Sequence, residues 1–428
     1  MRWYLFEDRT AGRLHPLSLA RPVFELVCGR ESLRRRVQRW FPGTEWGVFV
    51  RDYLQDVYAE EHPGASVNDI RTPQTQASLF INGQWLPEHR IPSDGAQHVA
   101  GFVDGTLAWV WVQPDEAAAF EVDDLPQMLA TIARSKHTID AGGRIIDRPW
   151  DLVAANAQQL IDDFSDEGVS QAPQQPHVQC LGDPRDVYVS PEAAIDPYVV
   201  LDTRHGPISI SKGAHVQSFT RIEGPCHIAR ESQIFRALIH GGTTIGPVCR
   251  VGGEVEESIL QAFVNKYHEG FLGHSYVCPW VNLGAISTTS DLKSDYSTVS
   301  VPLEGTPVET GLIKVGSFIG DHSKTAIDSM FNTGSAVGVM AMVLPGGRLL
   351  PRHIPSFCNI SFGELASDSP LEVNLQTARM AMARRGCEFT PAAEELFRFL
   401  HRATAHERQR AMERATGRIS IRSAAPPA

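Results

Sequence analysis

The amino-acid sequence predicts a parallel β-helix over about residues 187–355, preceded by an α/β domain and followed by a helical tail. Two observations predict the β-helix. Aliphatic residues recur at every sixth position, and a glycine often follows them directly, as in Ile245-Gly246 and Ile319-Gly320. A period of six is neither the 3.6 of a helix nor the alternation of an ordinary strand. It is typical of a solenoid in which each six-residue unit forms one flat side and three sides close a coil.

The series of aliphatic residues is long. Three stretches keep the period, with a one-residue restart inside the second: Val189, Ile195, Leu201; Ile210, Val216, Ile222, Ile228, Ile234, then Ile239, Ile245, Val251; and Ile313, Ile319, Thr325, Phe331, Val337, Val343, Leu349. These side chains are expected to fill a triangular interior, with coils stacked at a strand spacing of about 4.8 Å. Hexad solenoids are usually left-handed, so we expect a left-handed parallel β-helix. A β-sandwich would show irregular spacing instead.

The period fails over most of residues 251–313, where polar and titratable residues are dense. Loops held by a rigid scaffold often carry function. The sequence therefore places the candidate site in this interruption.

The length of 428 residues favours two or three domains. We expect an α/β domain over residues 1–175, the β-helix over 176–360 and a helical extension over 361–428. The Pro- and Gln-rich stretch 170–176 is typical of a linker. Pro370 and Pro391 each suit the first turn of a helix, which predicts two helices in the extension.

Composition narrows the possible functions. The net charge of −11 argues against nucleic-acid binding, which needs a basic face. The seven cysteines are scattered without a C-x-x-C pair, which argues against a disulfide framework and favours a reducing cytoplasm. No stretch approaches the roughly 20 apolar residues of a membrane span. We expect a cytoplasmic protein with neither nucleic acid nor membrane as a partner.

Three motifs carry a family resemblance: residues 245–250 (IGPVCR), residues 273–276 (GHSY) and residues 282–285 (NLGA). They resemble the acetyltransferase half of the bifunctional N-acetylglucosamine-1-phosphate uridyltransferases. The whole chain is similar to a divergent branch of that family, most specifically over residues 239–345. The resemblance implies a homotrimer that transfers an acetyl group from acetyl-CoA to the amine of a sugar phosphate or sugar nucleotide.

The resemblance also implies roles for individual residues. His274 falls on the catalytic histidine, and an imidazole that titrates near neutrality suits a general base. Arg250 falls on an arginine that contacts the sugar phosphate, where a guanidinium fork fits. Lys266 is expected to be a second phosphate cation. Tyr276 and Asn282 would bind the sugar, and backbone amides near Ala285 would face the thioester. Apart from the resemblance, Asp291 and Asp295 are typical loop-capping residues, and the alternative for Asp291 is that it orients the base.

Two departures from the family concern the acceptor pocket. The spacing from His274 to Asn282 is one hexad shorter than usual, and Ile286 stands where the family has glycine. Zinc binding is the alternative reading of four histidines, because trimeric γ-class carbonic anhydrases bind zinc on this fold: His240, His268, His274 and His322. Their spacing does not match that pattern, so no metal site is expected.

The N-terminal region resembles a degenerate sugar nucleotidyltransferase. Residues 12–22 (GRLHPLSLARP) resemble the nucleotide-binding signature, but residues 7–10 (EDRT) replace its phosphate-binding glycines and Val23 replaces its lysine. Residues 79–84 (LFINGQ) resemble the strand whose aspartate holds Mg²⁺, with Gln84 in that place. Mg²⁺ is expected only if this half is active. The residues that could bind the nucleotide are Arg9, Arg13, Arg21 and Asn82.

Three hypotheses remain open from the sequence. The first is an acetyl-CoA-dependent sugar-phosphate or sugar-nucleotide N-acyltransferase. The second is an active sugar-1-phosphate nucleotidyltransferase. The third is a non-catalytic trimeric ligand-binding module.

Overall fold

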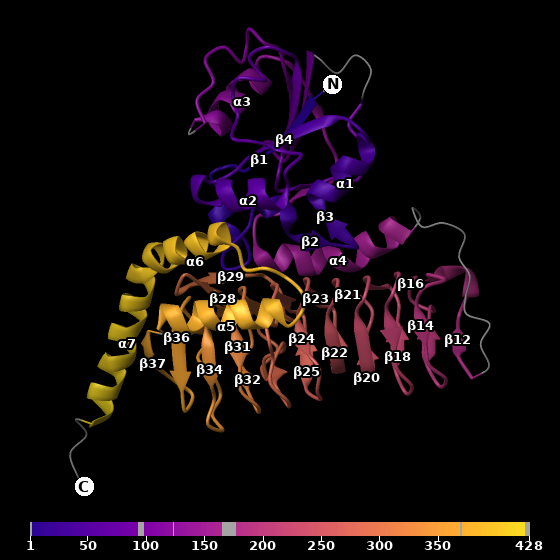
Figure 1. Cartoon of the computed structure of the whole chain (residues 1–428), viewed down its shortest axis with the longest axis vertical. Helices are drawn as coiled ribbons and strands as arrows, with labels where there is room; N and C mark the ends of the chain where they lie inside the picture. Colours follow the sequence, from indigo (N-terminus) through magenta and orange to yellow (C-terminus); the bar gives the residue numbers. More distant parts are fainter. Residues whose placement is uncertain (1, 93–97, 123, 165–176, 369, 424–428) are drawn as a thin grey trace. The chain divides into compact units, whose positions relative to one another are not determined.

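The computed structural model describes residues 2–92, 98–122, 124–164, 177–368 and 370–423. The chain divides into two compact units, each described by itself (Figure 1). The first unit contains Met1–Val27, Glu31–Arg148 and Pro391–Leu396, and the second contains Cys28–Arg30, Pro149–Thr390 and Phe397–Ala428. The linker predicted at residues 170–176 lies outside the described residues.

The first unit is built on a seven-stranded sheet in the order β10-β8-β9-β6-β1-β4-β5. In chain order the strands are β1 (Arg2–Phe6), β4 (Glu45–Phe49), β5 (Ser66–Val67), β6 (Ser78–Asn82), β8 (Val99–Val103), β9 (Thr106–Val112) and β10 (His137–Asp140). Only β9 runs antiparallel to its neighbours, β6 and β8. The helices are α1 (Leu33–Trp40), α2 (Gln55–Glu61) and α3 (Leu125–Arg134), and α3 packs against β8, β9 and β10. The predicted α/β domain is confirmed.

The central strands of this sheet are apolar over most of their length. Every residue of β6 is buried, as are Trp3 to Phe6 of β1, because a strand of a parallel sheet is covered on both sides. The rings of Tyr4, Phe49 and Phe80 meet one another at centroid distances of 5.2 to 5.9 Å and form part of one core cluster.

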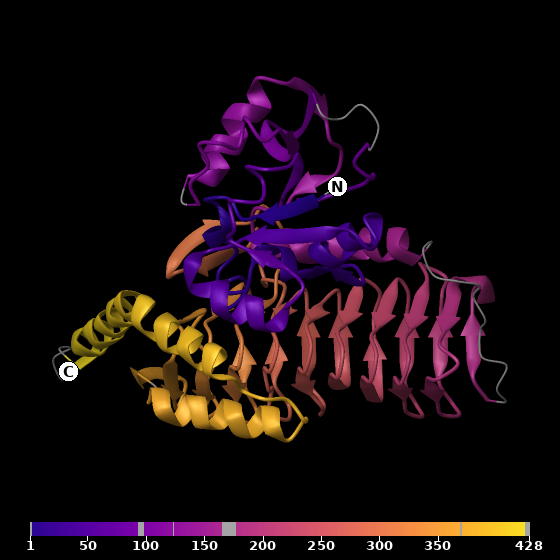
Figure 2. The same cartoon turned by 45° about the horizontal axis from the view of Figure 1, so that its top comes forward.

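The second unit contains a parallel β-helix of three faces, and Figure 2 shows its coils stacked side by side. Face 1 is the ladder β13 (Val187–Val189), β16 (Ile208–Ile210), β19 (Cys226–Ile228), β21 (Thr243–Ile245), β23 (Ile259–Leu260), β26 (Tyr276–Val277), β30 (Ser317–Ile319), β33 (Ser335–Val337) and β35 (His353–Ile354). The fold class predicted from the hexads is confirmed.

Faces 2 and 3 share two long strands. Face 2 comprises β14 (Ala194–Ile195), β17 (His215–Val216), the first halves of β20 (Gln233–Ile239) and β22 (Arg250–Glu256), β24 (Asn265–Lys266), a bridge at Asn282, β31 (Lys324–Thr325), β34 (Met342–Leu344) and β36 (Cys358–Ser361). Face 3 comprises β12 (Gln179–Leu181), β15 (Val200–Asp202), β18 (Arg221–Glu223), the second halves of β20 and β22, β25 (Phe271–Gly273), β27 (Thr288–Thr289) and β32 (Met330–Phe331).

The interior rows follow the predicted series closely. Ile210, Ile228, Ile245, Val277 and other hexad members are fully buried in one continuous cluster. Two predicted members are wrong, because Ile313 and Leu349 are 53% and 55% exposed. The coil takes Leu350 instead of Leu349, and Ile313 belongs to an excursion outside the coil.

The predicted interruption at residues 251–313 is only partly correct. Ile228, Ile245, Leu260 and Val277 are successive members of one interior row, but their spacing along the chain varies and is never a multiple of six. The six-residue period is therefore lost in the sequence, although the coils of the β-helix continue. The real excursion lies between Val277 and Ile319, which are neighbours in that row although the chain between them is much longer than one coil. It contains the antiparallel hairpin β28 (Ser300–Leu303) and β29 (Thr306–Glu309).

Helix α4 (Pro149–Phe164) groups with the β-helix and packs on face 1 against β19, β21 and β26. Asn156 fixes it, because its Nδ2 donates to Gly242 O at 2.8 Å and its Oδ1 accepts from Gly29 N at 2.7 Å. The sequence had assigned residues 149–164 to the N-terminal domain, and the compact units place them in the second unit.

The described residues of the C-terminal extension form three helices, one more than predicted: α5 (Leu371–Ala383), α6 (Pro391–Ala403) and α7 (Ala405–Ser423). Asn374 of α5 donates to Met340 O at 3.4 Å, and the helix lies against the C-terminal coils. Among the described residues, no helix combines the length and the apolar character that a membrane span requires.

Candidate functional site

His274 lies at the turn between faces 3 and 1, directly after β25, and is held between two carboxylates. Its Nδ1 is 2.7 Å from Asp291 Oδ2, and its Nε2 is 3.3 Å from Glu257 Oε2. The side chains of His274 and Asp291 are 9% and 13% exposed, whereas that of Glu257 is 50% exposed. Asp291 is therefore a fixed partner of the ring, and Glu257 can withdraw into solvent without disturbing the coil.

The two carboxylates change the acidity of His274. Burial lowers its pKa, but the hydrogen bonds to Asp291 and Glu257 outweigh burial and raise the pKa to about 9. The hydrogen bond with His274 in turn lowers the pKa of Glu257. At neutral pH the ring is an imidazolium, so it becomes a proton acceptor only after a ligand or alkaline pH removes that proton.

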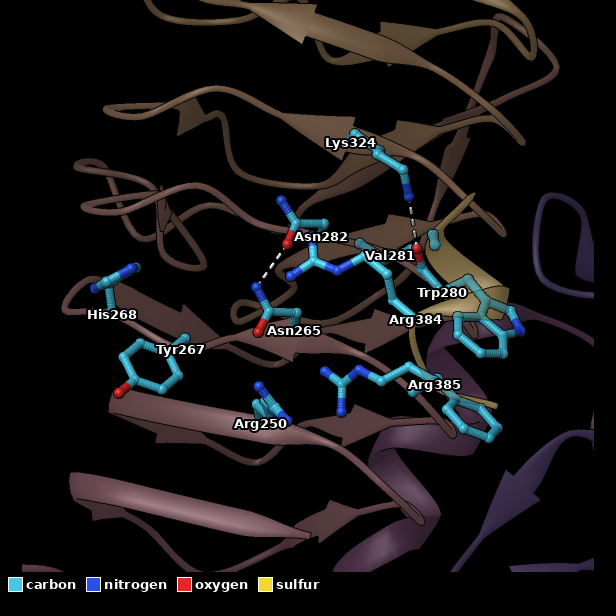
Figure 3. Close-up of a pocket in the computed structure, with 12 residues that line it drawn as sticks. Arg250, Asn265, Tyr267, His268, Trp280, Val281, Asn282, Lys324, Arg384 and Arg385 are labelled. Atoms are coloured by element: carbon cyan, nitrogen blue, oxygen red, sulfur yellow. Dashed lines mark hydrogen bonds between the residues drawn. The ribbon is translucent and has the colours of Figure 1, made fainter. Parts of the chain in front are cut away.

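A second cluster lines a pocket on face 2. Arg250, Asn265, Asn282 and Lys324 occupy neighbouring positions in the strand ladder, each beside an inward-pointing residue, so all four side chains point outward. The cavity measures about 390 Å³. Its other lining residues are Phe263, Tyr267, His268, Trp280, Val281, Ala381, Arg384 and Arg385, and Figure 3 shows how they converge.

The pocket is strongly cationic. Arg250 and Lys324 come from the strands, and Arg384 and Arg385 come from the segment that directly follows α5. None of the described lining residues is acidic, although the chain carries a net charge of −11. Arg250 Nε is buried without a hydrogen-bond partner in the described part of the chain. A site with this lining is suited to anions.

Both the helix end and burial affect these cations. Burial and the neighbouring Arg250 lower the pKa of Arg385, and burial lowers the pKa of Lys324 to about 8. Lys324 Nζ donates to Trp280 O at 3.1 Å. The C-terminal end of a helix favours positive charge, which offsets part of the repulsion among the arginines.

Lys266 is not in this pocket, contrary to the expectation that it would bind phosphate. It is paired in register with inward-facing Val251, so its side chain occupies an interior position of the coil and only 3% of it is exposed. Its Nζ donates to Gly252 O, His268 O and Gly270 O at 2.6, 3.2 and 2.7 Å. Burial lowers its pKa to about 8. The ammonium group donates its hydrogen bonds to these three carbonyls and so stabilises the corner between faces 2 and 3.

Tyr276 is also placed differently from the expectation that it would bind sugar. Its side chain points outward from face 1. In the strand ladder Tyr276 pairs with Ile259, which pairs in turn with Thr244, and on its other side Tyr276 pairs with Phe318. Helix α4 packs on this face, with Trp150 6.2 Å from Phe318 between ring centroids, and Tyr276 is completely buried. A covered residue cannot contact a substrate.

The predicted site residues therefore form two groups. Arg250 and Asn282 lie in the pocket on face 2, and His274 and Asp291 lie at the corner between faces 3 and 1, which is the corner opposite face 2. Ala285 is half-buried in the turn after face 2, and its carbonyl accepts from Asp328 N at 2.8 Å.

Sequence reasoning missed all the charged residues of these groups except Arg250, His274 and Asp291, and it also missed Asn265, Tyr267 and Trp280. Lys324 could have been found, because the hexad count places it beside the interior Thr325 on face 2. The same count would not have found Glu257, because the coil before His274 has 17 residues and a count of 18 gives Glu256 instead. Arg384 and Arg385 carry no periodic signal, because only the course of the chain after the last coil brings them to the pocket.

In the first unit, the predicted nucleotide-binding arginines have protein partners. Arg9 pairs with Asp124 at 3.3 Å and Arg13 with Asp147 at 2.8 Å, both at exposed positions. Arg21 uses its carbonyl to accept a bond from Arg51 Nη2 at 2.8 Å.

Asn82 and Gln84 are buried and mutually connected. Asn82 Nδ2 donates to Leu107 O at 2.9 Å, and its Oδ1 accepts from Gln84 N at 2.9 Å. Gln84 Nε2 donates to Ile146 O at 2.8 Å, and its Oε1 accepts from Thr10 at 2.9 Å. The Gln84 amide thus ties Thr10 to Ile146.

One set of described residues has the geometry to hold a metal ion: Glu256, Glu257 and His274. Lys314 Nζ already lies 3.1 Å from Glu256 Oε1, so a cation at this place would compete with the lysine.

Comparison with known proteins bears on the N-terminal part. Residues 3–167 match the family described as "Sugar nucleotidyl transferase". The match covers less than half of the chain and includes most of the first compact unit together with α4 of the second. The predicted relationship to the bifunctional family is confirmed, at low identity and over part of the chain.

Two relatives are named as bifunctional proteins. The chain is 32% identical over 93 residues to the bifunctional sugar-1-phosphate nucleotidylyltransferase/acetyltransferase of Sulfurisphaera tokodaii, and 30% identical over 90 residues to the bifunctional protein GlmU of Methanococcus maripaludis. The matches cover 22% and 21% of this chain, and 23% and 22% of the relatives. The chain thus spans less than a quarter of the length of these relatives.

Among solved structures, the UDP-N-acetylglucosamine acyltransferase of Campylobacter jejuni aligns with 50% of this chain and 82% of its own. The identity is 12% and the TM-score is 0.26.

Proposed function

We propose that this protein is an N-acyltransferase that moves the acetyl group of acetyl-CoA to the amine of a sugar phosphate or sugar nucleotide. The proposal depends on two sites that the same β-helix carries. One is the imidazole of His274, which lies between two carboxylates, and the other is the cationic pocket on face 2, whose described lining residues include no acid. The first suits proton transfer and the second suits the phosphate of the acceptor.

In this reaction the amine nitrogen attacks the thioester carbonyl. A C–N bond forms, the C–S bond breaks, and coenzyme A leaves as the thiol. When Glu257 withdraws from Nε2, the ring loses one of the two carboxylates that raise its pKa and releases the Nε2 proton to solvent. Nε2 then takes the proton that the amine loses and returns it to the sulfur. Asp291 at Nδ1 holds the ring so that Nε2 faces the reactants, and Glu257 leaves Nε2 when the acceptor binds. Ala285 lies at the corner between faces 2 and 3, on the other edge of face 3 from His274, so the contact with the thioester that was expected of its amide is not part of this proposal.

The two groups do not meet within one chain, so the proposal includes a homotrimer. The chain turns a corner shortly after each inward-pointing residue of face 2. Six exposed apolar residues lie one to three positions after such a residue and therefore along this corner: Tyr198, Phe219, Ile286, Ile327, Leu344 and Phe362. This is the corner between faces 2 and 3. The apolar residues form two groups along this corner, separated by three coils that carry Arg236, Gly253 and Glu269. Exposed apolar groups of this kind favour burial against another chain.

With this corner at a three-fold axis, face 2 of one copy would approach face 3 of the next. His274 is at the outer edge of face 3, and Trp280, Arg384 and Arg385 line the outer side of the pocket on face 2. The histidine of one copy would then approach the pocket of its neighbour, which completes the site.

A coupled thiol-release assay tests the proposal. The full chain is incubated with acetyl-CoA and with hexosamine 1-phosphates or UDP-linked amino sugars. We expect thiol release that His274→Ala reduces by at least about 100-fold, the scale of general base catalysis. Release at background level with every acceptor, or full activity in His274→Ala, would refute it.

A second candidate function is sugar-1-phosphate nucleotidyl transfer, with Mg²⁺ as cofactor. The family match over residues 3–167 favours it. Pyrophosphate release from a nucleoside triphosphate and a sugar 1-phosphate would establish it. Ligand binding without turnover by either assay would favour a non-catalytic module.

A further inference from the structure

We propose that the pocket on face 2 binds a nucleoside diphosphate group, with its phosphates on the arginines that follow α5 and its base at the Tyr267–His268 end. This inference rests on the proposed function and names the ligand class of the same pocket. A nucleoside diphosphate is present in sugar nucleotides and also in coenzyme A, so both are possible sources of the group.

The number of cations argues for more than one phosphate. Arg250, Lys324, Arg384 and Arg385 line one cavity, and none has a carboxylate partner among the described residues. A single phosphate gathers its charge on one group, whereas the diphosphate of a sugar nucleotide or of coenzyme A spreads its charge over two adjacent groups and can meet more of the four cations at once. Two adjacent guanidinium forks suit two adjacent phosphates.

The size of the cavity argues for more than an inorganic anion. Its volume of about 390 Å³ falls in the range of about 300–1,000 Å³ that small-molecule sites show. It extends over the four outward positions from Arg250 to Lys324 and over the width of face 2 between Trp280 and His268.

The distribution of residues along the pocket gives the ligand a direction. Figure 3 shows Arg385 and Trp280 on one side and Tyr267 and His268 on the other, with Asn265 and Asn282 between them. Tyr267 is 37% exposed and its ring is held by Phe235 at a centroid distance of 4.1 Å. An immobilised, partly exposed ring offers a surface for a planar base. Asn265 and Asn282 are joined by a side-chain hydrogen bond and keep further amide groups for ribose or phosphate.

Binding calorimetry on the full chain tests the inference with five probes: UDP, coenzyme A, inorganic pyrophosphate, inorganic phosphate and uridine. We expect UDP, coenzyme A or both to bind at least tenfold more tightly than pyrophosphate, pyrophosphate to bind more tightly than phosphate, and uridine to bind weakest. The preferred source of the group follows from the comparison of UDP with coenzyme A. Equal affinity for phosphate and both nucleotides, or no binding of either nucleotide, would overturn the inference.

Variants locate the binding site. Arg385→Ala should weaken the tighter nucleotide at least tenfold, and Arg385→Lys, which keeps the charge, should weaken it less. The matched control is Arg348→Ala, which removes an exposed arginine that pairs with Glu364 outside the pocket. Equal affinity of Arg385→Ala and the native chain would overturn the assignment.

The outcome is separable from that of the proposed function. Nucleotide binding that depends on Arg385, without acyl transfer to any acceptor, would refute only the proposed activity. Acyl transfer without nucleotide binding at this pocket would refute only this inference.

Discussion

The pairing of His274 with Asp291 makes a quantitative prediction for Asp291→Asn. The substitution removes the negative charge 2.7 Å from Nδ1 and keeps the shape of the side chain. The pKa of His274 is raised from 6.5 to about 9, and one pKa unit corresponds to about 1.4 kcal/mol, so the protonated ring contributes roughly 3 kcal/mol to folding. Two carboxylates share this contribution. Asp291 is the more buried of the two and makes the shorter contact, so its loss should remove about half of this contribution or somewhat more, on the order of 2 kcal/mol.

The sign of the pH dependence follows from linkage. The folded state holds the proton on His274 more tightly than the unfolded state. The contribution is therefore complete below pH 6.5 and is lost as the pH rises through about 9. The stability difference between the native chain and Asp291→Asn should be largest near pH 6, where Asp291 is still ionised, and should become small at pH 10.

Two measurements check this prediction. Urea unfolding at pH 6 and pH 10 gives the stability difference, and NMR titration of labelled histidines, assigned with His274→Gln, gives the pKa. We expect the pKa of His274 to fall by at least about one unit in Asp291→Asn. The control is Asp295→Asn, an exposed residue of the same excursion that bonds to Ser297. An unchanged titration of His274, or a destabilisation that is equal at both pH values, would refute the reasoning.

Three further predictions concern the fold and the assembly. Lys266→Met should lower the unfolding free energy by about 3 kcal/mol or more, because three buried carbonyls lose a charged donor; urea unfolding measures it, and an unchanged midpoint would contradict the interior placement. Asn156→Ala should cost about 2 kcal/mol by the same assay, since it unties α4 from Gly29 and Gly242, whereas exposed Gln158→Ala should cost little. Ile286→Glu should dissociate the trimer that light scattering is expected to detect in the native chain; a native monomer, or a trimer unaffected by the substitution, would contradict the proposed corner.

The sequence predicts the β-helix well because the interior of this fold repeats along a single axis. Each coil repeats the same three aliphatic positions, so the period is visible without knowledge of distant contacts. Arg250 and Asn282 were brought to one site by the family resemblance and not by this period, because the six-residue spacing is lost between them. Between Ile228 and Val277 the coils are shorter than three full hexads, so the count slips and the continuing coil looks like an interruption.

The errors at the site have tertiary causes. Lys266 stands where an aliphatic belongs, and nothing local reveals that its ammonium reaches three carbonyls at a corner. Tyr276 is exposed in a bare β-helix and becomes buried only because α4 covers its face. Arg384 and Arg385 are far along the chain from the strands that line the pocket, so their place there depends on the path of the C-terminal extension.

The most direct test of the central claim is the fate of the acetyl group. Acetyl-CoA with a ¹³C-labelled carbonyl and an amino-sugar phosphate are incubated with the native chain, His274→Ala and Arg250→Ala, and the products are analysed by mass spectrometry. The account predicts a labelled amide on the acceptor, lost in His274→Ala at saturating acceptor, and recovered in Arg250→Ala only when the acceptor concentration is raised. An acceptor without label in the native reaction, or equal labelling by His274→Ala, would contradict it.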